Sequence, residues 1–341
     1  MRVLLSGYYG YDNLGDEWLL ETVITYLKKS NCRITVLSNK PQKTAKKYGV
    51  NAISRWNFFR FIKQLLHSEL LLFGGGGLIQ DLSGIKTPFY YLSQILLAKW
   101  LGKKIVMIGQ GFGPVKNIFN RLLCEMIMPL VDLITTRDQV SFQWCQQLEL
   151  EDSRVINTSD LVWLKPFELK KEIKKTTWLI CLRSDWLGHK LPLWIESVKK
   201  RADKENVQLA FVAIGNTGDE ALLELIKQQP SFLNCSFYNR EQYLDAFNQA
   251  ALIISMRYHG LLLGAIAGVP IIGIGKDAKL ELIIESLHQS LATEYNVEEL
   301  ILLILKNYKV HQAKIINYGA GLKKEANKSV LALQMYLMNE N

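Results

Sequence analysis

Two charged side chains interrupt a long apolar stretch near residue 260, and their types suit them for chemistry. The stretch Leu252–Lys279 reads LIISMRYHGLLLGAIAGVPIIGIGKDAK, with Arg257 and His259 between its apolar runs. The pattern predicts a strand, a turn, a helix and a second strand, so both residues fall at the carboxyl end of a parallel strand. Open α/β sheets bind ligands at this edge, and helix amino termini attract anions. The pair therefore indicates a site for a negatively charged small molecule.

Two simpler interpretations of this stretch compete. A membrane span is disfavoured, because Arg257 and His259 lie near its middle and Gly264, Gly268 and Pro270 interrupt it. A buried or helix-capping histidine is the second interpretation, and spacing alone leaves it open.

The composition is that of a globular chain with room for two domains. The chain has 341 residues, of which 49% are hydrophobic. The amino-terminal segment MRVLLSGYYGYD has too short an apolar run for a signal peptide and predicts a first strand. No paired metal carboxylates or His/Cys cluster stand out, so we expect metal-independent chemistry. Five scattered cysteines without metal-type spacing fit reduced thiols in the cytoplasm, the expected compartment: Cys32, Cys124, Cys145, Cys181 and Cys235.

The net charge of +9 admits nucleic acid, an anionic membrane surface or anionic substrates as partners. The lysines are spread along predicted helices and concentrated in KKEIKK (Lys170–Lys175), with no aromatic-interleaved nucleic-acid motif. We therefore expect no nucleic-acid partner. A solvated surface is the simplest explanation, and a basic face in peripheral contact with an anionic membrane, at its inner surface, is the sharper alternative.

The first half of the chain alternates strand and helix patterns. RVLLSG predicts a strand that leads through GYYGYDNLGDE into a helix from about Asp16 to Lys29. The loop lacks GxGxxG, so a dinucleotide fingerprint is not supported. It contains Asn13, and Asp16 is either the helix N-cap or a substrate ligand. The segment Trp56–Ser68 predicts an amphipathic helix with its aromatic side chains in the core.

Further strand ends carry glycine or charge. ELLLFGGGGLIQD holds the run Gly74–Gly77, including Gly75 and Gly76, and ends at Asp81. Such a run indicates close approach of the backbone to a ligand or between domains, or else a tight βα turn. KKIVMIGQGFGP repeats the pattern, and the next strand ends at Arg137. Strand ends of this kind predict a doubly wound sheet with a site along its carboxyl edge.

The alternation breaks once and then resumes. We expect an amino-terminal Rossmann-like domain at 1–165, a polar linker at 166–177 and a second Rossmann-like domain at 178–320. In the second series WLICLRS ends at Arg183 and VQLAFVAIG ends at Gly215. The last helix, at 321–341, is expected to reach back to the first domain.

Six motifs in order resemble the polysaccharide pyruvyl transferases, in particular the cell-wall (CsaB) type. They are GYYGYDNLGDE, GGGGLIQD, GQGFGP, TRDQVS, CLRS, and MRYHGLLLGAIAGVP followed by KDAK. The resemblance spans nearly the whole chain. It implies a GT-B-like α/β architecture, in which two Rossmann-like doubly wound domains face each other across a cleft, the first on the acceptor side and the second on the donor side.

The resemblance also implies a reaction. A pyruvyl group passes from phosphoenolpyruvate to two hydroxyls of one sugar, giving a cyclic ketal and phosphate, with no other cofactor. Similar members act on a lipid-linked saccharide or a cell-wall glycan, typically on N-acetylmannosamine. His259 matches the catalytic histidine proposed as general acid, and the donor-binding positions are Arg137, Lys279 and Arg257. Expected acceptor or cleft positions are Asn13, Asp16, Gly75, Gly76, Asp81 and Arg183.

The chemistry of phosphoenolpyruvate fits these residue types. Its phosphate and carboxylate need two or three cations and backbone N–H groups. Protonation of its methylene carbon needs an acid with a pKa near neutrality, which histidine provides. Asp16 and Asp81 are candidates for the base.

Two departures from the family pattern leave the acceptor sugar open. Gly260 follows the histidine where alanine is more usual, and GKDAK replaces YDPK. A GT-B glycosyltransferase using a nucleotide sugar and a non-catalytic GT-B-like binding protein remain alternatives.

Overall fold

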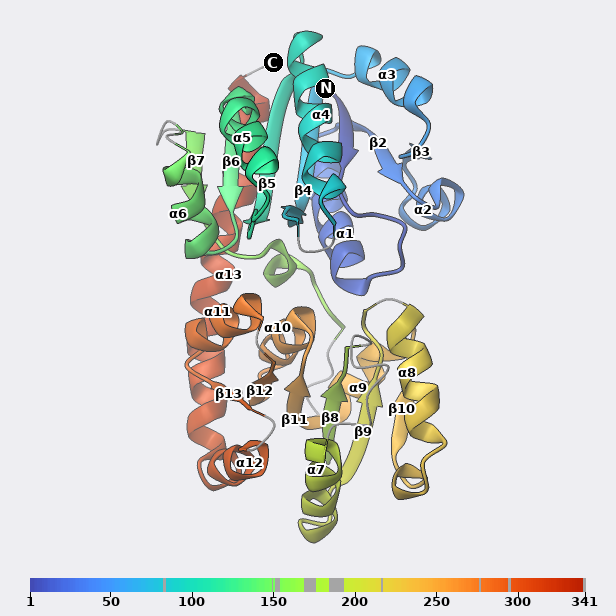
Figure 1. The fold of residues 1–341 in the computed structure, drawn as a ribbon, viewed down its shortest axis with the longest axis vertical. Coiled ribbons are helices and arrows are strands. Elements are labelled where there is room, and N and C mark those ends of the chain that lie inside the picture. Colours follow the sequence, from blue (N-terminus) through green and yellow to red (C-terminus); the bar gives the residue numbers. More distant parts are fainter. Residues whose placement is uncertain are drawn as a thin grey trace. The chain divides into compact units, whose positions relative to one another are not determined.

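The chain divides into two compact units, each built on its own parallel sheet (Figure 1). The first contains Met1–Lys165 and Leu322–Asn341, and the second contains Pro166–Gly321. This computed structural model describes residues 1–81, 84–148, 150, 154–168, 176–183, 193–215, 217–275, 277–293 and 296–339. The first unit therefore draws on both ends of the chain.

Over the described residues, the sheet of the first unit has seven parallel strands in the order β3-β2-β1-β4-β5-β6-β7. From β1 the chain moves outward through β2 and β3, and from β4 it moves outward in the opposite direction. The carboxyl ends of β1 and β4 therefore form the topological switch point, where doubly wound sheets bind ligands. The strands are β1 (Arg2–Ser6), β2 (Arg33–Ser38), β3 (Asn51–Ser54), β4 (Leu70–Ile79), β5 (Lys104–Phe112), β6 (Leu133–Thr136) and β7 (Val155–Asn157).

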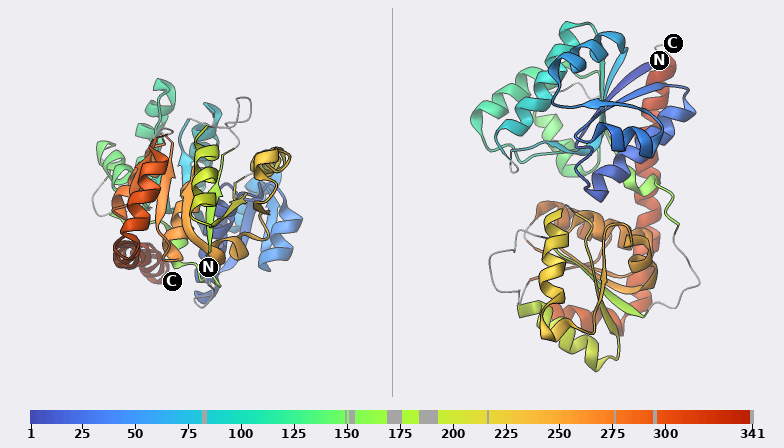
Figure 2. Two further views of the ribbon diagram at one scale, coloured as in Figure 1. Left: turned by 90° about the horizontal axis from the view of Figure 1, so that it is seen from below. Right: turned by 90° about the vertical axis from the view of Figure 1, so that its right-hand side faces the viewer.

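Helices cover both faces of this sheet (Figure 2). Right-handed crossovers place α1 and α2 on one face and α3 to α6 on the other. The helices are α1 (Leu14–Lys29), α2 (Pro41–Tyr48), α3 (Phe58–His67), α4 (Lys86–Trp100), α5 (Ile118–Ile127) and α6 (Gln139–Gln147), with short 3₁₀ turns η1 (Met128–Leu130) and η3 (Leu161–Leu164).

The second unit repeats the plan over its described part, with six parallel strands in the order β10-β9-β8-β11-β12-β13. Its switch point lies between β8 and β11. The strands are β8 (Thr177–Cys181), β9 (Gln208–Val212), β10 (Ser236–Tyr238), β11 (Ala250–Ser255), β12 (Ile271–Ile274) and β13 (Ser290–Ala292). The helices are α7 (Leu193–Lys204), α8 (Thr217–Lys227), α9 (Tyr243–Gln249), α10 (Tyr258–Ile266), α11 (Ala278–Ser286), α12 (Val297–Lys306) and α13 (Tyr308–Asn339), with the 3₁₀ turn η5 (Pro230–Phe232).

Apolar runs explain why these strands lie at the centre. Leu70, Leu71, Leu72 and Phe73 follow one another in β4, and all four are fully buried. A parallel strand with helices on both faces buries consecutive side chains, whereas a half-exposed strand would alternate. The doubly wound α/β fold predicted from the sequence is confirmed in both units.

Helix α13 is longer than the sequence predicts. The expected helix at 321–341 is part of a continuous helix that begins at Tyr308 and passes through the boundary between the units after Gly321. The part of α13 from Leu322 onward packs on the first unit, where the buried Ser329 hydroxyl lies 2.7 Å from the hydroxyls of both Thr135 and Thr158.

One expectation about the core is wrong. In α3 only Phe61 and Leu65 are buried, whereas Phe58 is 58% exposed and Phe59 is 85% exposed. Trp56, just before the helix, is 65% exposed. Spacing showed that this helix is amphipathic, but its sequence is apolar on more than one face.

Most of the predicted linker, including Lys170–Lys175, lies outside the described residues. Within the described chain, no helix is both long enough and apolar enough to cross a bilayer.

Candidate active site

The second sheet positions His259 at its switch point. Strand β11 ends at Ser255, and α10 begins at Tyr258, so His259 is the second residue of the helix. It is half-buried, and its ring meets that of Tyr258 edge-on, with 5.1 Å between centroids. The amino end of the helix adds positive partial charge beside the imidazole. An anion and a proton donor can therefore meet at this place.

The turn from β11 into α10 is held by Ser255. Its Oγ donates to the Arg257 carbonyl at 2.8 Å and accepts from the Arg257 N–H at 3.0 Å. A Cβ added to Gly260 would overlap this hydroxyl and lie 3.2 Å from Cys181 Sγ. Packing against Ser255 thus explains the glycine after His259. Burial raises the pKa of Cys181 to about 12, so this thiol stays protonated and is a poor nucleophile.

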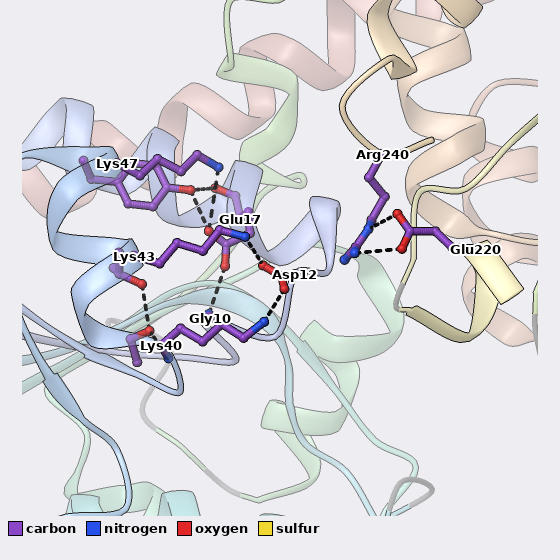
Figure 3. Close-up of polar contacts among 11 residues, drawn as sticks. Gly10, Asp12, Glu17, Lys40, Lys43, Lys47, Glu220 and Arg240 are labelled. Carbon is purple, nitrogen blue, oxygen red and sulfur yellow. Dashed lines mark hydrogen bonds and ion pairs between the residues drawn. The ribbon is translucent and has the colours of Figure 1, made fainter. Parts of the chain in front are cut away.

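Arg257 is tied to a buried carboxylate. Its Nε donates to Asp219 Oδ2 at 2.9 Å and its Nη2 to Asp219 Oδ1, while Asp219 is 2% exposed. Asp219 also accepts the Gly215 N–H at 3.0 Å, and a Cβ on Gly215 would lie only 2.6 Å from the guanidinium carbon. The next residue, Glu220, holds Arg240 through two bonds of 2.7 and 3.0 Å (Figure 3). The charge of Arg257 is therefore matched within the protein.

A second ion pair joins the ends of the two strands that flank β11. Arg183 follows β8, and its Nη1 lies 3.2 Å from Oδ2 of Asp277, which follows β12. Oδ1 of Asp277 caps α11 by accepting the Lys279 N–H at 3.0 Å. The side chains of Arg183 and Lys279 are partly exposed. Arg183, Lys279 and His259 thus follow three neighbouring strands at one edge of the sheet.

In the first unit, the loop after β1 and the start of α1 adjoin the glycine run of β4. Asn13 is the N-cap, because its Oδ1 accepts the Gly15 N–H at 3.2 Å. Asp16 is in the first helical turn, so the N-cap interpretation of Asp16 is wrong. Its Oδ1 would be 3.3 Å from a Cβ on Gly76.

The glycine run lies inside β4, so its interpretation as a tight βα turn is also wrong. A Cβ on Gly74 would lie 2.5 Å from the Tyr9 hydroxyl, and one on Gly75 would lie 3.1 Å from Leu19. Gly75 and Gly76 have φ of +90° and +94°, which disfavours other residues. Contacts from α1 and its loop account for these glycines.

Ion pairs with α2 fix the same loop (Figure 3). The Asp12 carboxylate forms ion pairs with two lysines: its Oδ2 lies 2.5 Å from Lys40 Nζ, and its Oδ1 lies 2.7 Å from Lys43 Nζ. Glu17 accepts the Gly10 N–H at 2.9 Å and the Tyr48 hydroxyl at 2.7 Å. These contacts hold the loop in a defined conformation at the carboxyl end of β1.

An arginine surrounded by aromatic rings lies at the first switch point, and sequence reasoning missed it. Arg55 follows β3 and is 7% exposed; its Nη1 donates to the Gly7 carbonyl at 3.1 Å, and its Nη2 donates to the Tyr91 hydroxyl at 3.3 Å. Among the described residues no carboxylate pairs with it, and its Nε has no hydrogen-bond partner. Five ring centroids lie 4.5–5.9 Å from its guanidinium carbon, those of Tyr8, Tyr11, Trp56, Tyr90 and Tyr91.

Parts of this cluster face solvent. Tyr8 is 43% exposed and stacks on Tyr11 with 4.1 Å between centroids, and Trp56 is 65% exposed. Exposed rings over a buried, unneutralised cation suit a ligand that has both an apolar ring face and polar oxygens. The signal in the sequence was YYGY directly after the first strand and RW directly after NAIS.

Arg137 is buried in the first unit. Its side chain is 4% exposed, its Nη1 lies 3.3 Å from Asp160 Oδ2, and its Nε lies 3.6 Å from Asp138 Oδ2. A Cβ on Gly111 would meet the guanidinium at 2.6 Å, so this glycine makes room for it. The structure thus ties Arg137 to carboxylates of its own unit.

Asp81 braces the loop after β5. Burial alone would raise its pKa, but the N–H groups of Asn117 and Lys116, which donate to Oδ2 at 2.7 and 2.8 Å, lower the pKa below its usual range. A general base works best with a pKa near the working pH, so Asp81 is poorly tuned for that role.

No group of three or more potential metal ligands occurs among the described His, Cys, Asp and Glu residues.

A sequence profile of polysaccharide pyruvyl transferases matches residues 13–277, which include Arg137, Arg183 and His259. The chain belongs to the polysaccharide pyruvyl transferase family. No curated protein matches significantly. The cell-wall subtype is a finer assignment than this match supports.

Solved structures show the same fold at low sequence identity. Anabaena Alr3699/HepE, in complex with UDP and glucose, is 11% identical over 99% of both chains, with a TM-score of 0.65. A putative UDP-N-acetylglucosamine 2-epimerase from Listeria monocytogenes is 12% identical over 98% of this chain and 96% of its own, with a TM-score of 0.68. The UDP-GlcNAc 2-epimerase of Neisseria meningitidis is 14% identical over 97% and 100%, with a TM-score of 0.65. The fold is thus GT-B-like, with two Rossmann-like domains.

Proposed function

We propose that this protein transfers a pyruvyl group from phosphoenolpyruvate to two hydroxyls of one sugar. The product is a cyclic ketal, and inorganic phosphate is released. Membership of the family supports the reaction type. One observation supports placing the reaction at the edge of the second sheet. His259 lies at the start of α10, and Arg183 and Lys279 follow the neighbouring strands.

The donor is proposed to bind at the edge of the second sheet. Phosphoenolpyruvate carries a phosphate and a carboxylate, which Lys279, Arg183 and the N–H groups at the start of α10 can accommodate. Arg257 is proposed to act through its pair with Asp219, by fixing the residue that precedes α10. Donor binding by Arg137 would require its contact with Asp160 to open, so we assign Arg137 a positioning role.

The proposed chemistry balances with one acid and one base. Protonated His259 donates its proton to the methylene carbon, which becomes a methyl group and leaves an oxocarbenium-like C2. The first sugar hydroxyl attacks C2 and loses its proton to a base. The second hydroxyl then forms its bond to C2 as the C2–O bond to phosphate breaks, and its proton leaves with the phosphate. We propose Asp16 as the base, because the Asp81 carboxylate already accepts the N–H groups of Lys116 and Asn117 and braces the loop after β5.

The acceptor is proposed to bind at the aromatic cluster of the first unit. A pyranose has an apolar ring face that stacks on Tyr8 or Trp56 and oxygens that suit a cation such as Arg55. We propose an N-acetylmannosamine unit of a cell-wall or lipid-linked precursor as the sugar, following the resemblance of the motifs.

The direct test is phosphate release. Purified protein is incubated with phosphoenolpyruvate and an N-acetylmannosaminyl acceptor, and phosphate is measured together with the mass of the acceptor. The expected result is one phosphate per acceptor that gains a pyruvyl group without its carbonyl oxygen. Phosphate release without change of the acceptor, or no release with any sugar offered, would contradict the proposal.

A nucleotide-sugar glycosyltransferase is the second candidate, favoured by the likeness to structures that hold UDP and glucose. A thermal-shift comparison separates the two, because a ligand stabilises the state that binds it. Stabilisation by phosphoenolpyruvate and not by UDP-glucose supports the pyruvyl transferase. The reverse supports the glycosyltransferase. Binding without turnover of either donor would indicate a non-catalytic binding protein.

A further inference from the structure

Three helices of the first unit expose an unusual number of large apolar side chains. The two most exposed are Phe59 at 85% and Trp100 at 82%. Solvent-facing aromatic residues at this density mark an interaction surface rather than ordinary scatter. The exposed apolar residues on these helices are Phe58, Phe59 and Leu66 of α3, Phe89, Leu96 and Trp100 of α4, and Ile118, Phe119, Leu122 and Met126 of α5.

These side chains share one face of one sheet. Helices α3, α4 and α5 lie on the same side of the first sheet, and α4 packs beside α5 (Figure 2). Helices α1 and α2 on the opposite side contribute no exposed large apolar residue. In the rest of the first unit, α6 exposes Val140 and α13 exposes Leu331, Met335 and Met338. The largest group of exposed apolar side chains is thus on α3, α4 and α5, and we call it the α3–α5 face.

The charge of the α3–α5 face is mainly positive. Its helices carry several exposed basic residues and a single acid, Glu125, while α3 and α4 contain no Asp or Glu. Lys99 of α4 lies beside a carboxylate, with 3.4 Å between its Nζ and Asp132 Oδ1. The exposed Lys and Arg of the three helices are Arg60, Lys63, Lys86, Lys99 and Arg121.

We propose that the α3–α5 face rests on the surface of an anionic lipid membrane. Aromatic and aliphatic side chains between lysines and arginines match a bilayer interface, where the apolar groups enter the acyl boundary and the cations meet anionic head groups. Because none of the described helices can span a bilayer, the contact is peripheral. This inference stands independently of the reaction proposed above.

A second copy of the chain fits the face less well. In a two-fold dimer the same patch meets itself, so the basic residues would oppose one another. A nucleic acid would satisfy the cations but leave Phe59, Trp100 and Met126 without an apolar partner. An anionic bilayer satisfies both kinds of side chain.

Vesicle flotation tests the proposal with the full chain. The vesicles contain either phosphatidylcholine alone or phosphatidylcholine mixed with phosphatidylglycerol. The protein is expected to float with the anionic vesicles, and high salt should reduce the bound fraction, because it screens head-group charge. Phe59→Ser combined with Trp100→Ser should weaken binding about tenfold or more. Arg60→Glu combined with Lys63→Glu should weaken it by a similar factor, mainly at low salt.

Two matched controls make the outcome specific. Leu233→Ser removes an apolar residue of the second unit that is 70% exposed, and Lys46→Glu reverses an exposed charge on α2. Both should bind vesicles as the parent does. Absence of flotation with anionic vesicles would overturn the proposal, as would equal losses in the controls. A concentration-dependent dimer that the Phe59 and Trp100 substitutions abolish, without vesicle binding, would assign the face to a second copy instead.

Discussion

Arg183 and Asp277 form an ion pair that joins the ends of two strands, β8 and β12, which are separated in the sheet by β11. The Nη1–Oδ2 distance is 3.2 Å. His259 is the second residue of α10, which follows β11, so the pair crosses the sheet edge beside the strand that leads to the proposed acid. Because Asp277 also caps α11 in front of Lys279, one carboxylate orders two cations of the proposed donor site.

Replacing Arg183→Met should raise the KM for phosphoenolpyruvate about tenfold or more. A charge-assisted hydrogen bond to the donor contributes roughly 1.5–3 kcal/mol. The measurement is the initial rate of phosphate release at varied donor concentration. Arg240→Met is the control, since Arg240 pairs with Glu220 in the same unit. A KM equal to that of the control would remove Arg183 from the donor site.

Replacing His259→Gln should reduce kcat by about 10²–10⁴, the usual contribution of general acid catalysis. The melting temperature should stay close to that of the parent, because His259 is half-buried at the sheet edge rather than in the core. His67→Gln, on the exposed side of α3, serves as the control. Parent-like kcat in the His259 variant would refute the assignment.

Replacing Gly260→Ala should destabilise the protein by about 1–3 kcal/mol, because the new Cβ overlaps Ser255 Oγ. Adding Ser255→Ala removes the obstructing atom, so the double variant should be more stable than the sum of the single effects predicts. Urea unfolding measures both. Gly321→Ala is the opposite control: it has free space in α13 and should stabilise by roughly 0.5–1 kcal/mol. Additive losses in the double variant would show that Ser255 is not the obstacle.

Replacing Arg55→Met should raise the KM for the saccharide acceptor several-fold and leave the KM for phosphoenolpyruvate unchanged. The substitution removes the charge beneath the rings but keeps much of the apolar volume. Trp56→Ser should act in the same direction, and Phe58→Ser, with similar exposure, should not. Loss of donor affinity instead would place the cluster on the donor side.

Asp12 should make stability depend on pH at the acidic end. Burial alone would raise its pKa, but hydrogen bonds from Lys40 and Lys43 lower the pKa to about 2. A lowered pKa stabilises the native state at pH values above the pKa of the unfolded state, about 3.9. That contribution is lost as the pH falls toward 2. Its size is about 1 kcal/mol or less, because the lysines are half exposed.

The test compares the parent with a Lys40→Met, Lys43→Met variant in urea. The difference in unfolding free energy should be present at neutral pH and shrink as the pH approaches 3. A difference that persists unchanged at low pH would mean that the lysines act without Asp12.

Much of the fold could be predicted because local sequence patterns determine its strands and helices. Consecutive buried residues such as Leu70–Phe73, with glycine or charge directly after them, are typical of parallel strands that end at a ligand-binding edge. The last helix was expected at 321–341, yet α13 begins at Tyr308 and continues through Gly319 and Gly321. Glycine weakens a helix by only about 1 kcal/mol, which packing can outweigh. In α3, apolar residues lie on more than one face of the helix, so their spacing does not show which of them are buried.

The candidate site could be predicted only in part. Arg257 and His259 follow β11, as the alternation of apolar runs predicts, but the partner of Arg257 is Asp219, which lies on another helix. Such pairs depend on which strands become neighbours, and one sequence does not reveal this. The same reason hid Arg55, whose aromatic neighbours come from three separate segments.

The path of α13 has a consequence for biogenesis. Because Leu322–Asn341 belong to the first unit, a nascent chain that has emerged only as far as Lys165 still lacks Ser329, which lies against Thr135 and Thr158. The half that is translated first is completed last. Loss of Leu322–Asn341 would therefore damage the amino-terminal unit, because it removes the helix that packs beside β6 and the residues after β7.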